Sequence, residues 1–464
     1  MKTQLLGAIA LSVSFSSLSA QWVQATPTAS PAVRSGSALV TAPSGNLVLF
    51  GGNLAFGPTN QTYRYDGTTW TLLTNVGAPS SRSNMDLVYD PNAGVFRMYG
   101  GVNQGFIGST VYDQTWEMSV SGTTATWTQN VIVGTTPGGL CEHTTSFDTA
   151  HNVMVVHGGL SDPFFPIDSD QTWEFDGTAW TATATFPATN PGPLERAAMC
   201  YHPGLDRTIL FGGIDVQGSW NNKTWAYDSV THTWAELTIA GPKPSARTGP
   251  KLAYDSIRGV LVLNGGADPS DPLGNAYVND TWEFDGASWT KVSTNITGSR
   301  LDATMAFMPT RNRMVQFSGI NYSTFVQYND TWEWETSTFG MGCAGTNGTP
   351  HLSVNASPRL GQSWTVTASN MNPTFNLGVL VFGFTELPGV DLGVLLGMTG
   401  CSGYVTPDVI VSLTAGAPGT ASWTWPVVAG TVGDHFAGQA LCFDPTVNVF
   451  GFTASNAISV TVGN

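Results

Sequence analysis

The sequence predicts an all-β protein: a six-bladed β-propeller closed by its N-terminal strand and followed by a small β-sandwich domain. Three observations lead to this prediction. A strand-like segment ending in a glycine pair recurs along the chain, and two aromatic markers recur with it in a fixed order. In addition, Trp22 near the N-terminus stands at the spacing expected of the last strand of a blade, although the other strands of that blade do not precede it. Repeats of this kind are typical of propellers and solenoids.

The glycine pair gives the period of the repeat. The spacings between successive pairs run from 49 to 58 residues, which fits a four-stranded blade of about 50 residues. Two adjacent glycines let two backbones approach where a side chain would clash. A sixth, weaker copy ends in Ser318-Gly319. The five complete pairs are Gly51-Gly52, Gly100-Gly101, Gly158-Gly159, Gly212-Gly213 and Gly265-Gly266.

The two aromatic markers confirm the phase of the repeat. Each copy carries Asn or Asp, two further residues and then an aromatic residue, and Thr precedes the aromatic in all six copies. Turn residues such as Asp66-Gly67 follow, which predicts a tight hairpin before the next strand. The first marker is Asn60/Tyr63, Asp113/Trp116, Asp170/Trp173, Asn222/Trp225, Asn279/Trp282 and Asn329/Trp332, and the second is Trp70, Trp127, Trp180, Trp234 and Trp289.

The missing sixth copy of the second marker predicts how the ring closes. The sixth repeat has Trp332 but no convincing later Trp before the chain becomes glycine-rich near Phe339. Trp22 lies 12 residues before Arg34, as Trp70 lies 12 before Arg82. We therefore expect the N-terminal strand to complete the sixth blade, which removes two exposed strand edges.

These markers resemble the kelch repeat, in which a strand ends in Gly-Gly and an aromatic residue and a Trp follow. The resemblance covers residues 21–339, and the propeller is similar to the central domain of galactose oxidase. With its C-terminal Cys-bearing β module, the whole chain resembles secreted bacterial proteins of this family. It implies blades that bury their apolar faces only by stacking around a ring. Galactose oxidase itself holds copper with two Tyr and two His, and nothing in this sequence matches that site. No metal ligand set, catalytic residue or cofactor is predicted.

The repeat stops at about residue 340, and short strand-like segments at near-regular spacing predict a β-sandwich over 340–464. Three of the five cysteines lie in this region, Cys343, Cys401 and Cys442. A disulfide between Cys343 and Cys401 is the favoured pairing, because each cysteine lies in a Gly-Cys step of a turn-like segment, although sequence alone leaves the connectivity open.

The N-terminal segment 1–20 reads as a signal peptide. Lys2 gives it a positive start, an apolar stretch follows, and cleavage is expected after Ser19 or Ala20. The predicted organisation is therefore a signal peptide over 1–20, a propeller over 21–339 and a sandwich over 340–464. We expect a secreted, periplasmic or extracellular protein.

Charge and hydropathy narrow the range of partners. The formal net charge is −15, and a surface of that sign repels nucleic acid and anionic membranes. No later segment has the length of apolar sequence needed for a membrane span. The expected partner is a protein, peptide or glycan, and the expected state is a monomer.

Four arginines open the first strand of a blade and form the candidate binding residues: Arg34, Arg82, Arg247 and Arg300. The kelch resemblance implies that arginines at this phase line one mouth of the central channel, where guanidinium groups bind carboxylates. Leu140 and Leu194 replace them in two blades, with His143 and Arg196 nearby and slightly out of phase. The alternative is structural: each arginine bonds to Asp or to backbone carbonyls within the repeat.

Two functions compete. The first is a secreted binding or scaffold module that recognises a protein, peptide or glycan through the loops after the glycine pairs, at 53–59, 102–112, 160–169 and 267–278. The second is an exported kelch-type carbohydrate-active enzyme, such as a sialic-acid mutarotase or epimerase, which would need an arginine beside a desolvated Glu or His in a deep pocket.

Overall fold

The computed structural model describes most of the propeller and a part of the C-terminal region. The predicted signal peptide and the predicted disulfide pair, Cys343 and Cys401, lie outside the described residues. The described residues are 21–104, 108–162, 169–183, 190–215, 217–269, 276–293, 300–335, 338–339, 350–354, 363–383, 386–391, 402–405, 407–426, 435–446 and 452–461.

The chain divides into two compact units, Ala20–Thr336 and a second unit that begins at Ser337. In the described part of the first unit, six sheets share one order, from an inner strand to an outer strand. We name them blades 1 to 6. Blade 1 holds β2 (Ala38–Thr41), β3 (Leu47–Phe50), β6 (Thr62–Tyr65) and β7 (Trp70–Leu72). Blade 2 holds β9 (Asp86–Asp90), β10 (Val95–Tyr99), β13 (Thr115–Ser121) and β14 (Thr124–Gln129), with β8 (Thr74–Val76) added in parallel at the edge.

Blades 3 to 6 repeat the order. Blade 3 holds β15 (Thr144–Asp148), β16 (Val153–His157), β17 (Thr172–Phe175) and β18 (Trp180–Ala182). Blade 4 holds β19 (Ala198–His202), β20 (Arg207–Phe211), β21 (Thr224–Asp228) and β22 (Thr233–Glu236). Blade 5 holds β23 (Lys251–Asp255), β24 (Val260–Asn264), β27 (Thr281–Phe284) and β28 (Trp289–Ser293). Blade 6 holds β29 (Thr304–Met308), β30 (Arg313–Phe317), β33 (Thr331–Glu335) and β1 (Gln21–Ala25).

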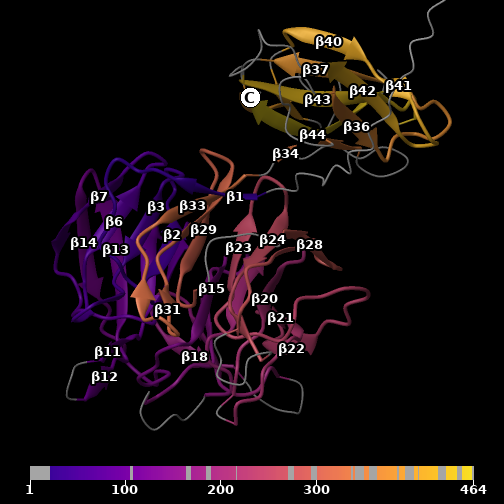
Figure 1. Ribbon diagram of the computed structural model, residues 1–464. Helices are drawn as coiled ribbons and strands as arrows, with labels where there is room; N and C mark the ends of the chain where they lie inside the picture. The colour runs from indigo at the N-terminus through magenta and orange to yellow at the C-terminus, as the bar shows by residue number, and fades with distance from the viewer. Residues whose placement is uncertain are drawn as a thin grey trace, which may run out of the picture. The chain divides into compact units, whose positions relative to one another are not determined.

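The N-terminal strand supplies the outer strand of blade 6. β1 lies beside β33 (Figure 1). The two strands pair antiparallel, with Trp22 opposite Trp334. The inner strands contact one another in the cyclic order β2, β9, β15, β19, β23, β29 and back to β2. The all-β propeller predicted from the sequence is therefore the observed fold, with the N-terminal strand paired where the position of Trp22 predicts.

The glycine pairs lie where neighbouring blades approach each other. Gly100 has a left-handed backbone with φ of 67°, and a Cβ atom added to it would lie 2.3 Å from the carbonyl oxygen of Leu140 in the next blade. The following residue, Gly101, donates its N–H to that same carbonyl at 2.8 Å. The pair is therefore required both by the conformation and by the contact between blades.

Short hairpins follow the glycine pairs and lie at one end of the blades. They are β4 (Asn53–Leu54) with β5 (Gly57–Pro58), β11 (Val102–Gln104) with β12 (Ser109–Val111), β25 (Ala267–Asp268) with β26 (Ala276–Tyr277), and β31 (Ile320–Asn321) with β32 (Val326–Gln327). Figure 1 shows β11, β12 and β31 together at the same end of the propeller. We call this end the hairpin face.

The second unit is a β-sandwich. One sheet has the order β34 (Thr338–Phe339), β44 (Phe452–Thr461), β43 (His435–Phe443), β37 (Gly378–Gly383) and β40 (Val409–Ser412). The other has β35 (His351–Val354), β36 (Ser363–Ser369), β42 (Ala421–Pro426) and β41 (Thr414–Ala415), and β38 (Glu386–Asp391) pairs with β39 (Ser402–Val405).

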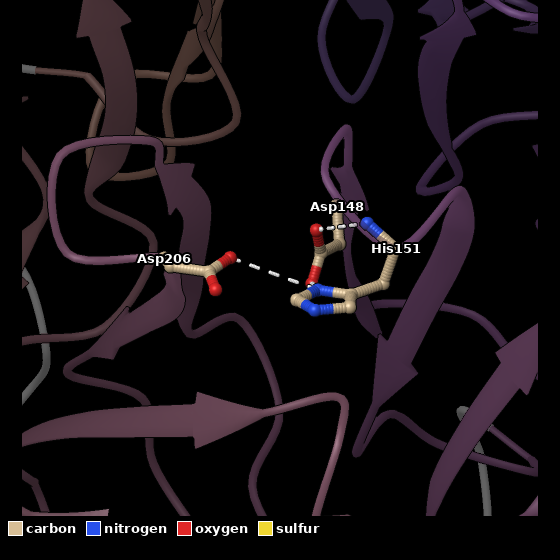
Figure 2. A group of neighbouring side chains, drawn as sticks. All are labelled: Asp148, His151 and Asp206. Carbon is tan, nitrogen blue, oxygen red and sulfur yellow. Dashed lines mark hydrogen bonds and ion pairs between the residues drawn. The ribbon is translucent and has the colours of Figure 1, made fainter.

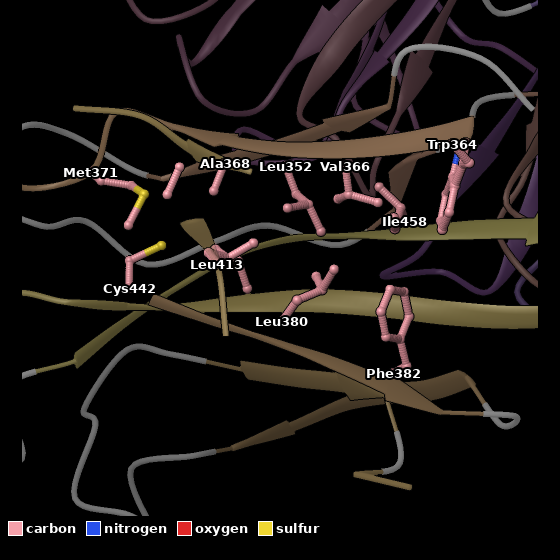
Figure 3. Packing of buried hydrophobic residues seen from close by; sticks show 12 residues of the cluster. Leu352, Trp364, Val366, Ala368, Met371, Leu380, Phe382, Leu413, Cys442 and Ile458 are labelled. Atoms are coloured by element: carbon pink, nitrogen blue, oxygen red, sulfur yellow. The ribbon is translucent and has the colours of Figure 1, made fainter. Parts of the chain in front are cut away.

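Side chains from both sheets meet in one apolar core (Figure 3). Trp364 and Val366 of β36 face Leu380 and Phe382 of β37, as period-two alternation in a half-buried strand requires. Cys442 lies in the same core as a free thiol, and burial raises its pKa to about 12. This thiol is therefore packed as an apolar group. Nowhere in the described ranges is there a helix long and apolar enough to cross a membrane.

Candidate functional site

The inner strands of the six blades surround a central cavity of about 330 Å³. Its wall mixes hydroxyl groups with apolar side chains, because inner-strand residues alternate between facing the axis and facing the neighbouring blade. Asp86 and Lys251 are the charged residues of this wall. The first strands of the blades therefore line a channel of mixed polar and apolar character.

At the hairpin face the channel ends in a ring of residues with left-handed backbone. Each stands just before the inner strand of its blade, and each has φ between 51° and 63°. Backbone hydrogen bonds of 2.8 to 3.0 Å join five of the six neighbouring pairs, for example from Asn84 N–H to the Gly36 carbonyl and from Arg196 N–H to the Glu142 carbonyl. The ring residues are Gly36, Asn84, Glu142, Arg196, Gly249 and Asp302.

The side chains of this ring form a charged network. Arg196 donates to both carboxylate oxygens of Glu142, from Nε to Oε2 at 2.8 Å and from Nη2 to Oε1 at 2.7 Å. Asn84 Nδ2 also donates to Oε1 of Glu142, at 3.0 Å. Nη1 of Arg196 lies 4.0 Å from Oδ1 of Asp302, and the hydroxyl of Tyr322 donates to Oδ2 of Asp302 at 2.6 Å. Residues of four blades are therefore held together at the channel mouth.

This network borders a recess of about 50 Å³, which we call the mouth recess. Its wall includes the ring residues and His143. His143 is 6% exposed, and neither of its ring nitrogens has a hydrogen-bond partner in the part of the chain that the structure describes. Burial lowers the pKa of His143 to about 4, so its imidazole is neutral at pH 7.

Asp86 and Lys251 lie in the walls of both the recess and the channel. Oδ2 of Asp86 accepts the backbone N–H of Thr145 at 2.9 Å. Desolvation raises the pKa of Asp86, and the positive charge of Lys251 opposes that shift. The two residues continue the polar lining from the mouth into the channel.

The four predicted arginines lie elsewhere, inside their own blades. Arg247 is 0% exposed; its Nη1 donates to the Gly265 carbonyl at 3.0 Å and to Oδ1 of Asp280 at 2.6 Å. Arg34, Arg82 and Arg300 repeat this arrangement, with Gly51 and Gln61, Gly100 and Gln114, and Ser318 and Asp330 respectively.

Hydrogen bonds within each blade therefore hold these four arginines, as expected if their role is structural. None of the four is among the residues that line the channel cavity or the mouth recess. Burial lowers the pKa of Arg82 to about 10, so it keeps its charge at neutral pH and stays bonded within the blade. Of the predicted binding residues, only His143 reaches the recess.

The sequence carried a signal for the arginine partners. The partner is the residue just before the recurring Thr, and blades 3 and 4 have Leu140 and Leu194 in place of the arginine. The ring residues were harder to find. Gly, Asn and Asp adopt a left-handed backbone easily, but Glu142 and Arg196 do not, so their place in the ring is visible only by counting two residues on from the arginine position.

A second cluster, Asp148, His151 and Asp206, has the residue types of a metal site (Figure 2). The repeat explains it. Oδ1 of Asp148 accepts the N–H groups of Ala150 and His151, and Oδ2 contacts Nδ1 of His151 at 3.0 Å. The corresponding Asp255 in blade 5 makes the same turn and pairs its second oxygen with Arg258. His151 thus replaces an arginine in a structural turn.

Comparisons with known proteins agree with this architecture. The model of the KLHDC2/KLHL20/DRC7 Kelch-repeats domain matches residues 96–300 and 206–375. A solved structure titled "Structure of YjhT" superposes with a TM-score of 0.51 at 15% identity, covering 66% of this chain and 95% of that chain. At that identity the likeness shows the fold alone. With a family match over more than half of its length, the chain belongs to the family of kelch-repeat β-propellers.

Proposed function

We propose that the protein is exported and acts as a binding module, whose protein, peptide or glycan ligand docks on the hairpin face. Three neighbouring hairpins are bonded into one rim. Tyr322 N–H donates to the hydroxyl of Tyr277 at 2.7 Å, and Nε2 of Gln327 donates to the Asn53 carbonyl at 3.1 Å. A ligand would therefore meet a continuous surface around the mouth recess.

The observation that supports this proposal most directly is the exposed position of Phe325, in the turn between β31 and β32. Its side chain is 79% exposed, and its backbone is left-handed with φ of 56°. A bulky residue in that conformation is strained, and strain of this kind concentrates at ligand-binding positions. Phe56, in the turn between β4 and β5, is fully exposed. Exposed aromatic side chains supply large contact areas in interfaces.

The test is an array of peptides and glycans probed with the full chain and with a Phe56→Ser/Phe325→Ser variant. Both side chains are exposed, so the variant should fold normally. Val230→Ser is the matched control, because Val230 is 63% exposed in the turn between β21 and β22, at the end of the strands away from the hairpins. Ligands captured by the wild type and the control but lost by the double variant support the proposal. Equal capture by all three proteins contradicts it.

A second candidate is a carbohydrate-active enzyme of the sialic-acid mutarotase or epimerase class. The neutral, buried His143 beside the Arg196–Glu142 pair favours it, because such a reaction needs a proton acceptor at neutral pH. Both oxygens of Glu142 already accept hydrogen bonds, which makes that carboxylate a poor base. Proton NMR of anomer interconversion with sialic acid tests this function, and a rate equal to the uncatalysed one rules it out.

A further inference from the structure

The mouth recess carries polar groups beyond those that its own network uses. We infer that it binds the terminal residue of a neutral saccharide through its hydroxyl groups. This inference rests on the proposed binding function and names the class of ligand.

The first step is that the network is rigid before any ligand arrives. The Arg196–Glu142 pair is doubly bonded, and Asn84 fixes the same carboxylate from a third blade. The side chain of Glu142 is 6% exposed and that of Arg196 is 25% exposed. A site whose side chains are already fixed binds with a smaller loss of conformational entropy.

The second step is that hydrogen-bonding groups are left over. Nη1 of Arg196 has its nearest carboxylate oxygen, on Asp302, at 4.0 Å, which is too long for a hydrogen bond. His143 has one donor and one acceptor nitrogen, both buried and both without a partner among the described residues. A buried polar group without a partner is costly, and a bound hydroxyl or water would satisfy it.

The third step is the charge of the recess. The carboxylates of Glu142 and Asp302 line it against the two cations Arg196 and Lys251, and desolvation raises the pKa of the third carboxyl group, on Asp86. The whole chain carries −15. The recess therefore has no excess of positive charge to attract an acidic sugar or acidic peptide, in contrast to the carboxylate ligand that the four arginines suggested. A hydroxyl group donates to a carboxylate and accepts from a guanidinium, so neighbouring sugar hydroxyls match the mixture.

The fourth step is shape. Tyr322 stands at the edge of the network, 38% exposed, with its hydroxyl bonded to Asp302 and its N–H to Tyr277. A fixed aromatic ring offers a flat apolar surface to the C–H face of a pyranose. The recess and the channel of about 330 Å³ share Asp86 and Lys251 in their walls, so the two spaces are neighbours.

The test is calorimetric titration of the full chain with two matched sets of oligosaccharides, one ending in neutral hexose or N-acetylhexosamine and one ending in uronic or sialic acid. We expect binding of neutral ends, with affinity reduced about 10-fold or more in Arg196→Gln, since a hydrogen bond to a charged group is lost. Arg64→Gln is the matched control, because Arg64 lies on the outer half of blade 1 and donates to the Gly122 carbonyl. It should bind as the wild type does.

Thermal melting checks that each variant folds. If Arg196→Gln melts early, Tyr322→Phe removes a single hydroxyl at a half-exposed position and should weaken binding of the same neutral sugars. Preference for acidic ends, or neutral binding unchanged in both variants, overturns the inference. Absence of all sugar binding also overturns it. Peptide capture that depends on Phe56 and Phe325 would then leave the proposed binding function standing.

Discussion

Trp22 donates its indole N–H to the hydroxyl of Thr281 at 2.9 Å, across 259 positions of the chain. The bond joins the outer strand of blade 6 to the third strand of blade 5. Outer-strand tryptophans elsewhere make the same bond to the Thr of the preceding blade, at Trp70–Thr331, Trp180–Thr115, Trp234–Thr172 and Trp289–Thr224. This bond explains why Thr precedes the aromatic residue in five of the six repeats. In blade 2 the indole of Trp127 has no partner within the described residues.

Trp22→Ala should destabilise the propeller by about 3–5 kcal/mol, the usual cost of emptying a buried aromatic site. Trp22 is 4% exposed and packs against Trp334. Chemical unfolding followed by tryptophan fluorescence measures the change. Phe56→Ala, at a fully exposed loop tip, is the control and should unfold as the wild type does. Equal midpoints for the two variants would contradict the role of β1.

The Arg247–Asp280 pair should be strongly coupled. Arg247→Leu leaves the carboxylate of Asp280, which is 12% exposed, without its main partner, and should cost about 3–5 kcal/mol. Blade 3 has Leu140 and Gln171 at these two positions. Arg247→Leu/Asp280→Gln copies that combination and should be more stable than the single Arg247→Leu variant. A double-mutant cycle measures the coupling, and additive effects would sink the idea.

Gly100→Ala should destabilise the protein by more than its backbone angle alone accounts for. Gly94 provides the comparison, because it has φ of 71° and no atom within 4 Å of an added Cβ. Gly94→Ala should cost about 1–2 kcal/mol from conformation. Gly100→Ala adds a clash with the Leu140 carbonyl and should cost at least about 2 kcal/mol more. Urea unfolding of both variants decides the point, and equal costs would contradict the close approach of the blades.

His151 should stabilise the fold at acidic pH. Its bond to Asp148 raises its pKa above the ordinary value of about 6.5, and Asp206 adds to the shift. The contribution is therefore full below about pH 6.5 and is lost as pH rises through the raised pKa. His151→Gln should lower the free energy of unfolding at pH 5.5 by a few tenths to about 1 kcal/mol, and by less at pH 8.5. A larger loss at pH 8.5 would contradict this pairing.

His143, in contrast to His151, should destabilise the fold at acidic pH. Its lowered pKa of about 4 means that the unfolded chain takes up the proton first, so stability falls as pH drops from about 6.5 toward 4. His157 has the same shift and adds to the fall. In His143→Leu the loss between pH 7 and pH 5 should be smaller by about 1–2 kcal/mol. Urea unfolding at several pH values measures this change. If the free energy of unfolding depends on pH in the same way in the variant and the wild type, His143 is not buried as a neutral group.

The propeller could be predicted from the repeat, because each marker residue occupies the equivalent structural position in its blade. Thr281 and Trp22 belong to that pattern, so phase alone places them together. The site was not predictable in the same way. Arg247 repeats because the blade needs it, whereas Arg196 and Glu142 differ from blade to blade, and only the ring of blades brings them into contact. The mouth of the channel is therefore formed by residues that differ between repeats. The sequence shows which residues these are, but it does not show which of them are in contact.

The pairing of β1 with β33 also constrains how the chain can reach its native state. The two strands come from the opposite ends of the propeller sequence, so blade 6 cannot be completed until its third strand has been made. Closure over so long a span is entropically slow, and we expect the other blades to form first. Until then β33 presents an open edge that a second copy's N-terminus could fill, so slow closure at high concentration would favour strand-exchanged dimers.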